Sequence, residues 1–348
     1  MGVTDHKCIE CKAVLKFNPA KQKWVCEYCG TQYSLEDLER DKEQNKSKKN
    51  EKKFARITLN KNYKEYHCPD CGAQIVMDEN TSVTACVYCW NTAIISDRLT
   101  GEFAPKHVIP FKKTKEQAVE AFSNYKKGKW FMPSEFVKKE NIQKTSGVYI
   151  PFYLYDMDVF EQINVNAIKE TKWSDSYFYY TRKDYYKVYR AGDMSFCKIP
   201  TDASKKFRDD IMDSIEPFDY NGLVEFNSSY MSGFLAEKYD IGMDELESRA
   251  KKRAIETAKD ILYKDIIGYD EKNIRSSVDE VDIKETSYVL LPIWMLNVKY
   301  NGKIYTLAMN GQTGKFIGNV PISWKKVAKV WSIIFVIVTT ILLLINLL

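Results

Sequence analysis

The segment Cys8-Ile9-Glu10-Cys11 is followed by a second, Cys26-Glu27-Tyr28-Cys29, and the whole pattern then repeats. Each cysteine recurs 60 positions later, so that the second set comprises Cys68, Cys71, Cys86 and Cys89. A Cys-x-x-Cys turn directs two thiolates at one ion, and two such turns complete a tetrahedral site with metal–sulfur bonds of about 2.3 Å. The repeat therefore predicts two zinc ribbons, over residues 1–39 and 61–102.

Four thiolates with no open coordination position are typical of a structural zinc site and leave no place for a metal-bound water. Iron in the same cage of four sulfurs is the alternative that the residues leave open. A ribbon is too short for a self-sufficient core, so we expect metal binding, on the order of 10–16 kcal/mol, to keep each ribbon folded. We therefore predict two structural Zn²⁺ ions. Lys12 and Trp90 stand at knuckle positions where the backbone often requires a positive φ.

Aromatic residues in the ribbons allow two interpretations. They could stack on nucleic-acid bases, or they could form the small cores of the ribbons, which is the interpretation we prefer. The residues concerned are Trp24, Tyr28, Tyr33, Tyr88 and Trp90.

The segment between the ribbons, residues 40–60, is rich in lysine and poor in apolar residues, and indicates a solvated linker. A basic patch for nucleic acid or anionic lipid is the alternative, but Asp41, Glu43 and Glu51 dilute its charge.

Residues 103–321 have the composition of a globular domain. Hydrophobic residues make up 45% of the chain and aromatic residues 14%, which excludes wholesale disorder, and the net charge of +5 is small. Capping and breaker residues predict helices from Thr114 to Lys127 and from Met243 to Ile267. One face of the second helix carries an apolar stripe that we assign to core packing, formed by Leu246, Ala250, Ala254, Ala258, Ile261 and Leu262.

Strands are expected over residues 148–160 and within 174–190. Two further strands, 288–300 and 303–309, flank Asn301-Gly302, the strongest short signal of a β-hairpin. We therefore predict an α+β domain with a mainly antiparallel sheet.

No catalytic constellation is visible in the sequence. Of the three histidines, His6 and His67 adjoin the zinc knuckles and His107 stands alone, and none has a sequence-visible nucleophile or acid as a catalytic partner. The ninth cysteine, Cys197, lies between Phe196 and Lys198 and is expected to pack rather than react. We therefore expect the protein not to be an enzyme.

The first residues lack the apolar segment of a secretory signal, so a reducing cytosol is expected for the body of the protein. Residues 330–348 contain fourteen Val, Ile, Leu and Phe residues and no charge, and would span roughly 28 Å as a helix. Lys325, Lys326 and Lys329 precede them. Residues 322–348 thus predict a basic juxtamembrane segment and a single transmembrane tail anchor, with the body in the cytoplasm.

Beside the two cysteine tetrads, three further segments carry a resemblance to a known family. They are Gly147-Val148-Tyr149-Ile150-Pro151-Phe152, Leu291-Pro292-Ile293-Trp294 and Asn310-Gly311-Gln312-Thr313-Gly314. With the apolar terminus, they make the chain similar to the TFIIB-type zinc-ribbon membrane proteins of Gram-positive bacteria.

That family is associated with phage-shock-type and SPFH-domain proteins, and some members help to bring the SPFH partner to the membrane. The resemblance implies an adaptor that holds a cytosolic SPFH-domain or phage-shock-type protein at the bilayer. A membrane-tethered zinc-ribbon protein that binds nucleic acid is the alternative hypothesis.

Overall fold

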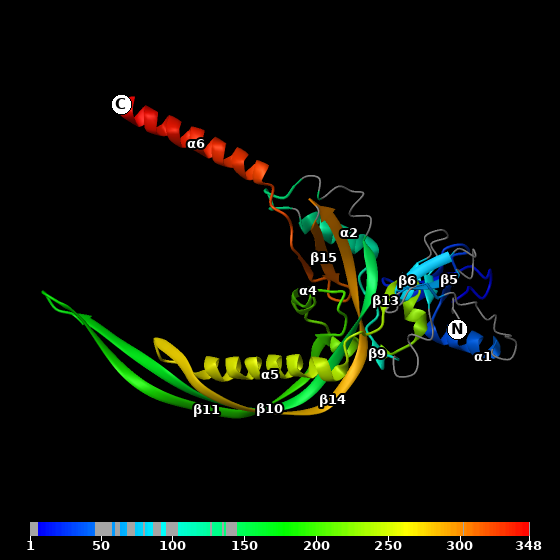
Figure 1. The fold of residues 1–348 in the computed structure, drawn as a ribbon, viewed down its shortest axis with the longest axis horizontal. Coiled ribbons are helices and arrows are strands. Elements are labelled where there is room, and N and C mark those ends of the chain that lie inside the picture. The colour runs from blue at the N-terminus through cyan, green and yellow to red at the C-terminus, as the bar shows by residue number, and fades with distance from the viewer. Residues whose placement is uncertain are drawn as a thin grey trace. The chain divides into compact units, whose positions relative to one another are not determined.

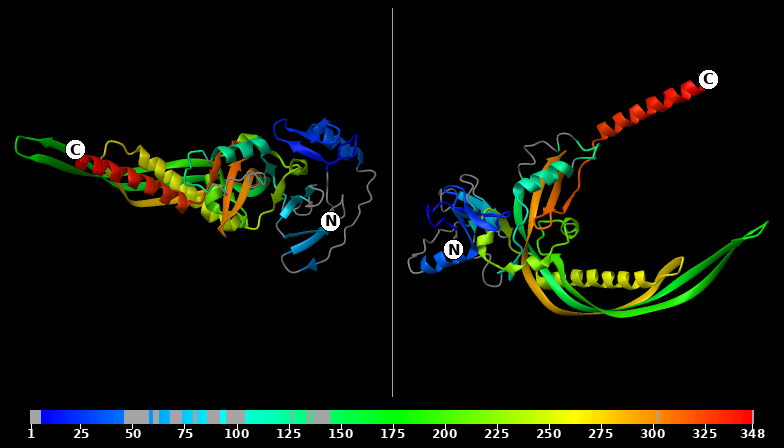
Figure 2. Two further views of the ribbon diagram at one scale, coloured as in Figure 1. Left: turned by 90° about the horizontal axis from the view of Figure 1, so that it is seen from above. Right: turned by 180° about the vertical axis from the view of Figure 1, so that it is seen from behind.

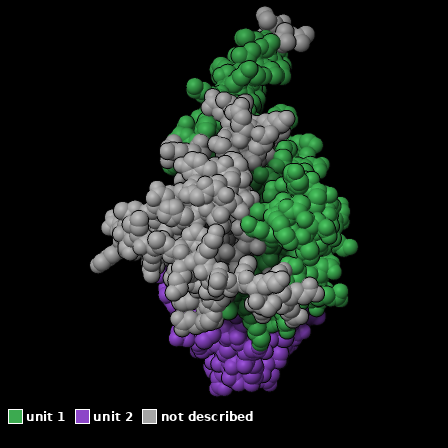
Figure 3. Space-filling view, turned by 90° about the vertical axis from the view of Figure 1, so that its right-hand side faces the viewer, with its two compact units in different colours: residues 1–150, 206–238, 290–348 green, residues 151–205, 239–289 purple. Residues whose placement is uncertain are grey.

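The computed structural model describes residues 6–45, 58–59, 63–67, 74–78, 81–85, 92–94, 104–125, 127–133, 136, 145–301 and 303–347. The contacts of the chain group it into two compact units (Figure 3). Unit 1 comprises Met1–Ile150, Lys206–Lys238 and Leu290–Leu348, and unit 2 comprises Pro151–Lys205 and Tyr239–Val289.

Unit 1 begins with a small antiparallel sheet. Its strands are β1 (Leu15–Asn18), β2 (Lys23–Cys26) and β3 (Gln32–Tyr33), and helix α1 (Leu35–Asn45) follows them. The register places Phe17 opposite Trp24 and Trp24 opposite Tyr33, so three aromatic side chains share one face.

The other elements of unit 1 are short, apart from the C-terminal helix. The strands are β4 (Thr58–Leu59), β5 (Tyr63–His67), β6 (Gln74–Asp78), β7 (Thr81–Ala85), β8 (Thr92–Ile94), β9 (His107–Val108), β12 (Val224–Glu225), β13 (Leu235–Glu237), β15 (Lys303–Asn310) and β16 (Phe316–Gly318). The helices are α2 (Lys115–Tyr125), α4 (Asp209–Ser214), the 3₁₀ turns η5 (Tyr220–Gly222) and η6 (Ser228–Met231), and α6 (Trp324–Leu347).

Three long strands form the backbone of a ten-stranded sheet in the described residues: β10 (Ser146–Ser174), β11 (Tyr179–Asp202) and β14 (Glu271–Tyr300). The order of neighbouring strands is β12-β9-β14-β10-β13-β7-β8. In addition, β11 pairs with β10, β15 pairs with β14, and β16 pairs with β15. β10 and β11 pair antiparallel along nearly their whole length, whereas β10 and β13 pair in parallel at Val148 and Leu235.

Unit 2 contains the β10–β11 hairpin, the first part of β14, and the long helix α5 (Met243–Asp265). Figure 1 shows α5 lying along one face of these curved strands. Alternate residues of β10, among them Tyr155, Met157 and Val159, are buried against the alanine stripe of α5. Small side chains allow a helix to approach a sheet closely, and they form the inner face here.

Several predicted elements are confirmed. Helix α2 lies inside the predicted range 114–127, α5 begins at Met243 as predicted, and the turn at Asn301, where φ is 48°, joins β14 to β15. The stripe on α5 is core as expected, except that Ile261 is 49% exposed. The stripe turns away from the sheet at that position, while Leu262 continues the packing.

The predicted fold class requires correction. The large sheet is mixed, because β10 and β13 pair in parallel whereas β10–β11, β14–β15 and β15–β16 pair antiparallel, and no second ribbon appears among the described residues. In the range 61–102, β5 pairs with β6 and, on its other side, with β4 in a separate three-stranded sheet, whereas β7 joins the large sheet through Ala236 of β13. The four cysteines of the second tetrad, Cys68, Cys71, Cys86 and Cys89, lie outside the described residues, as does Trp90.

The predicted transmembrane anchor also requires correction. A helix, α6, does form within 322–348, and apolar side chains such as Phe335 are exposed on it. Yet among the described parts of the chain, no helix is both long enough and apolar enough to cross a membrane. The portion of α6 whose side chains are all described, 324–341, includes Lys325, Lys326 and Lys329. The single-pass assignment to the cell membrane therefore does not hold for the described structure.

Candidate metal centre

The first cysteine tetrad forms one compact cluster. The sulfur atoms of Cys8, Cys11, Cys26 and Cys29 all lie within 4.8 Å of one another, and no disulfide joins them. The Sγ atoms of Cys8 and Cys29 are 3.5 Å apart, and those of Cys11 and Cys26 are 3.4 Å apart. It is the one such cluster of metal-ligating side chains among the residues that the structure describes.

Two tight turns, both held by the backbone, present these sulfurs. In the first, the amide of Cys8 donates to Ala13 and the amide of Lys12 donates back to Cys8. In the second, the amide of Gly30 donates to Cys26. Lys12 has a φ of 64° and Gly30 a φ of 78°, which confirms the positive φ expected at the first knuckle. A side chain at Lys12 makes that turn more strained than glycine would.

The local environment separates the pKa values of the thiols. Burial opposes ionisation of Cys8, but backbone hydrogen bonds at Cys11 and the Tyr33 hydroxyl outweigh it and lower the pKa of Cys8 to about 6. At Cys11 a backbone hydrogen bond at Ala13 favours the thiolate, but burial and the neighbouring thiols prevail and raise the pKa to about 12. Hydrogen bonds from Thr31 lower the pKa of Cys29. Sulfurs this close cannot all ionise unless a cation neutralises them.

The cluster fits a four-coordinate metal ion. Metal–sulfur bonds of about 2.3 Å in a tetrahedron place neighbouring sulfurs about 3.8 Å apart, close to the separations observed here. Two hydroxyls support the sulfurs: Tyr33 Oη lies 3.1 Å from Cys8 Sγ, and Thr31 Oγ1 lies 3.2 Å from Cys29 Sγ. Such outer contacts orient ligands and tune their basicity. The first tetrad can therefore bind one metal ion.

The ribbon packs against another segment of unit 1. Trp24 is 1% exposed, and its Nε1–H donates to the carbonyl of Ser229 in η6 at 2.7 Å. The ring of Tyr230 lies 5.2 Å from Trp24 and 5.4 Å from Phe17. The amide of Phe17 also donates to the carbonyl of Ser232. The burial of Trp24 and Tyr33 confirms their predicted core role, but the core extends to η6, which no local pattern indicates.

Other residues differ from expectation. Tyr28 is 84% exposed, so it is not part of a ribbon core. Cys197 is exposed rather than packed, because a register shift near Tyr155 and Met157 displaces this part of β11. Tyr88 and His67 have no described side chain, whereas His6 is buried within the ribbon, where its carbonyl accepts from Leu15.

A comparison with curated proteins finds a relative of nearly the same length. The uncharacterized protein YdjG of Bacillus subtilis (strain 168) is 32% identical to the chain over 330 residues, which cover 95% of the chain and 94% of the relative. No protein-family model matches the chain, and no solved structure matches it. The chain belongs to the family of YdjG.

Proposed function

We propose that the protein is a zinc-ribbon adaptor, in which structural Zn²⁺ shapes the N-terminal region and an exposed surface holds a protein partner. The main support for this proposal is that Trp24 packs the ribbon against η6 of unit 1, so the ribbon is not a separate nucleic-acid-binding module. A closed set of four thiolates supports structural zinc rather than catalytic zinc. The second tetrad has the same cysteine spacing as the first, and we propose that it binds a second Zn²⁺. Its ligands would be Cys68, Cys71, Cys86 and Cys89.

The partner class comes from the family resemblance described above, and is an SPFH-domain or phage-shock-type protein. We assign no enzymatic activity. An adaptor needs an exposed, preformed contact surface, and the end of the β10–β11 hairpin has these properties. Its tip reaches past the end of α5 within unit 2 (Figures 1 and 2).

Three successive aromatic side chains are exposed at this tip: Tyr177 by 86%, Phe178 by 65% and Tyr179 by 95%. Aromatic residues are enriched where proteins bind one another, because they bury a large area at small entropic cost. Solvent-exposed aromatic groups side by side are unusual on a monomer and favour a binding role.

The tip is held in one conformation by Asp175. Its carboxylate accepts from the amides of Tyr177 and Phe178 and from the hydroxyl of Tyr180, each at 2.8 Å. These hydrogen bonds, first that from Tyr177, lower the pKa of Asp175, so the carboxylate stays ionised at neutral pH. Tyr180 also stacks on Trp173, with 5.4 Å between ring centroids. A preorganised turn reduces the entropic cost of binding.

The test measures binding of the zinc-loaded full chain to a purified SPFH-domain protein from the same organism, by isothermal titration calorimetry. The triple variant Tyr177→Ser, Phe178→Ser, Tyr179→Ser is expected to bind at least about 10-fold more weakly, because each lost hot-spot aromatic costs on the order of 1–2 kcal/mol. The control is Tyr28→Ser, which removes an equally exposed tyrosine from the ribbon.

Unchanged affinity in the triple variant would exclude the tip as the contact surface. Absence of a complex between the wild-type chain and the SPFH-domain protein would reject this partner class.

A further inference from the structure

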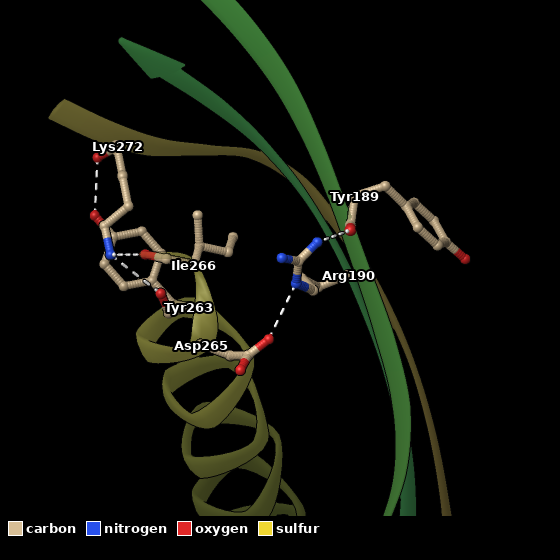
Figure 4. Close-up of polar contacts among 6 residues, drawn as sticks. All are labelled: Tyr189, Arg190, Tyr263, Asp265, Ile266 and Lys272. Atoms are coloured by element: carbon tan, nitrogen blue, oxygen red, sulfur yellow. Dashed lines mark hydrogen bonds and ion pairs between the residues drawn. The ribbon is translucent and has the colours of Figure 1, made fainter. Parts of the chain in front are cut away.

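A second surface of unit 2 lies on the face of the sheet opposite α5. Ile163, Val165 and Ala167 of β10 and Val188 of β11 point toward the helix and form a buried cluster with Ile266. Since side chains alternate along a strand, the residues between them point to the other side. Figure 4 shows this at one position, where the ring of Tyr189 points away from α5 and the guanidinium of Arg190 points toward Asp265.

Tyr185, Lys187 and Tyr189 form a row on that outer face of β11. The ring of Tyr185 is 75% exposed and that of Tyr189 is 56% exposed, and Lys187 between them is exposed as well. Residues two apart on a strand are separated by about 6.6–6.8 Å, so the two rings are about 13 Å apart. Flat rings at this spacing, with a cation between them, suit two bases of an extended single strand that are separated by one further nucleotide, with the cation facing the phosphates between them.

The neighbouring strand adds hydrogen-bonding groups to the same face. Lys187 pairs across the sheet with Asn166, and Tyr189 pairs with Asn164. The amide of Asn164 donates to Ser276 of β14 at 3.2 Å, and the Tyr189 hydroxyl donates to Gln162 at 3.3 Å. Side-chain amides offer donors and acceptors to base edges and to the 2′-hydroxyl of RNA.

Lysines and carboxylates share this part of the face. Lys172, Lys183 and Lys187 lie there, and Glu170 ion-pairs with Lys172 at 2.7 Å and with Lys183 at 2.8 Å. Lys183 also lies 3.7 Å from Glu271. Lys187 is thus the cation best placed to meet a phosphate, since it lies between the two rings.

We propose that this face, centred on Tyr185, Lys187 and Tyr189, binds single-stranded RNA by stacking bases on the two rings. The site is separate from the hairpin tip and from the ribbon, and it goes beyond the adaptor function. The proposed nucleic-acid site therefore lies on unit 2 and not on the ribbon, where Trp24 and Tyr33 are buried and cannot stack on bases.

The experiment measures binding of the zinc-loaded full chain to a fluorescein-labelled oligouridine of twelve nucleotides by anisotropy, at several salt concentrations. Tyr185→Ala and Tyr189→Ala are each expected to weaken binding about 10-fold, as for loss of one stacked base. Lys187→Gln is expected to lower the slope of log K against log salt by about 0.7. Both tyrosines are exposed, so circular dichroism of the variants should match the wild type.

Tyr28→Ala is the matched control, because it removes an exposed tyrosine that lies in the ribbon, outside this face. Equal weakening by the control and test variants would overturn the site, as would no binding of oligouridine at low salt. Tighter binding of the matching oligothymidine DNA would overturn the assignment to RNA. Failure here leaves the SPFH-domain titration unaffected, so the two proposals are tested separately.

Discussion

The N-terminal ribbon and the α5-covered sheet of unit 2 are both built on antiparallel strands, but different interactions stabilise them. The ribbon has strands of two to four residues, and its cysteine cluster supplements a small aromatic core. In unit 2, strands of more than twenty residues bury alternate side chains against a helix of 23 residues. Metal binding thus adds the stability that side-chain burial alone does not provide where the strands are too short to bury much.

The sharpest way to separate the two regions is to remove one metal ligand. Cys26→Ser is expected to abolish metal binding at the first tetrad, and with it a contribution on the order of 10 kcal/mol to ribbon folding. Elemental analysis should show one metal ion fewer per chain than in the wild type. The matched control is Cys197→Ser, an exposed cysteine outside the cluster, which should leave the metal content unchanged. Equal metal content in Cys26→Ser and the wild type would reject the site.

The reverse perturbation targets unit 2. Ile163 is fully buried in the cluster beneath α5, so Ile163→Ala is expected to destabilise unit 2 by about 3 kcal/mol while metal content stays constant. Urea unfolding followed by circular dichroism measures the loss. Ile163→Val, which removes one methyl group, should cost about 1 kcal/mol. A loss of metal in Ile163→Ala would show that the two regions are not stabilised independently.

A smaller effect is expected where the ribbon meets η6. Trp24→Phe keeps an aromatic ring but leaves the carbonyl of Ser229 without the indole donor, at a cost of about 1–2 kcal/mol. Amide hydrogen exchange of residues 15–33 should become faster, with zinc still bound. Tyr28→Phe at the exposed ribbon position should change nothing. No difference between the two variants would show that the contact with η6 does not stabilise the ribbon.

The smallest expected effect concerns Glu161, a carboxylate buried on the inner face of β10. Neither of its oxygens has a hydrogen-bond partner among the described residues. Burial raises its pKa, the nearby Lys259 opposes this, and Asp279 adds to it. Glu161→Gln is expected to stabilise unit 2 by about 1 kcal/mol at neutral pH, because it removes the cost of a buried charge.

The sign of the pH dependence follows from the raised pKa. Below the unfolded pKa of Glu161, near 4.5, the group is protonated in both states and costs no charge burial. As the pH rises through the higher folded value, the wild type loses stability relative to Glu161→Gln. Thermal unfolding at pH 4.5 and pH 8 should show a larger gain for the variant at pH 8. An equal gain at both values would contradict an ionisable, buried Glu161.

The sequence was most informative where local chemistry determines structure. Cysteine spacing predicted the first metal cluster because a Cys-x-x-Cys turn is a local motif, and capping residues predicted α2 and the start of α5. The stripe from Leu246 to Ala258 predicted a buried helix face. Each signal depends on residues a few positions apart.

Long-range partners carry no comparable local signal. Trp24 donates to a carbonyl 205 residues away, and the parallel pairing of Val148 with Leu235 makes the sheet mixed. The same limit applies to β7, which pairs with β13 although the two strands lie far apart in the sequence. Tyr185 and Tyr189 belong to a tyrosine-rich segment of the sequence. Which of its tyrosines lie on the outer face of the hairpin is known only once the strand register is known.

Metal folds the ribbon, whereas side-chain packing folds unit 2. Hydrogen exchange of the full chain, with and without a zinc chelator, separates the two contributions. The amides of Leu15–Asn18 and Lys23–Cys26 are expected to lose their protection on chelation, while those of α5 and of Met157–Val165 keep theirs. Retained protection of the ribbon strands after complete removal of zinc would contradict this role of the metal.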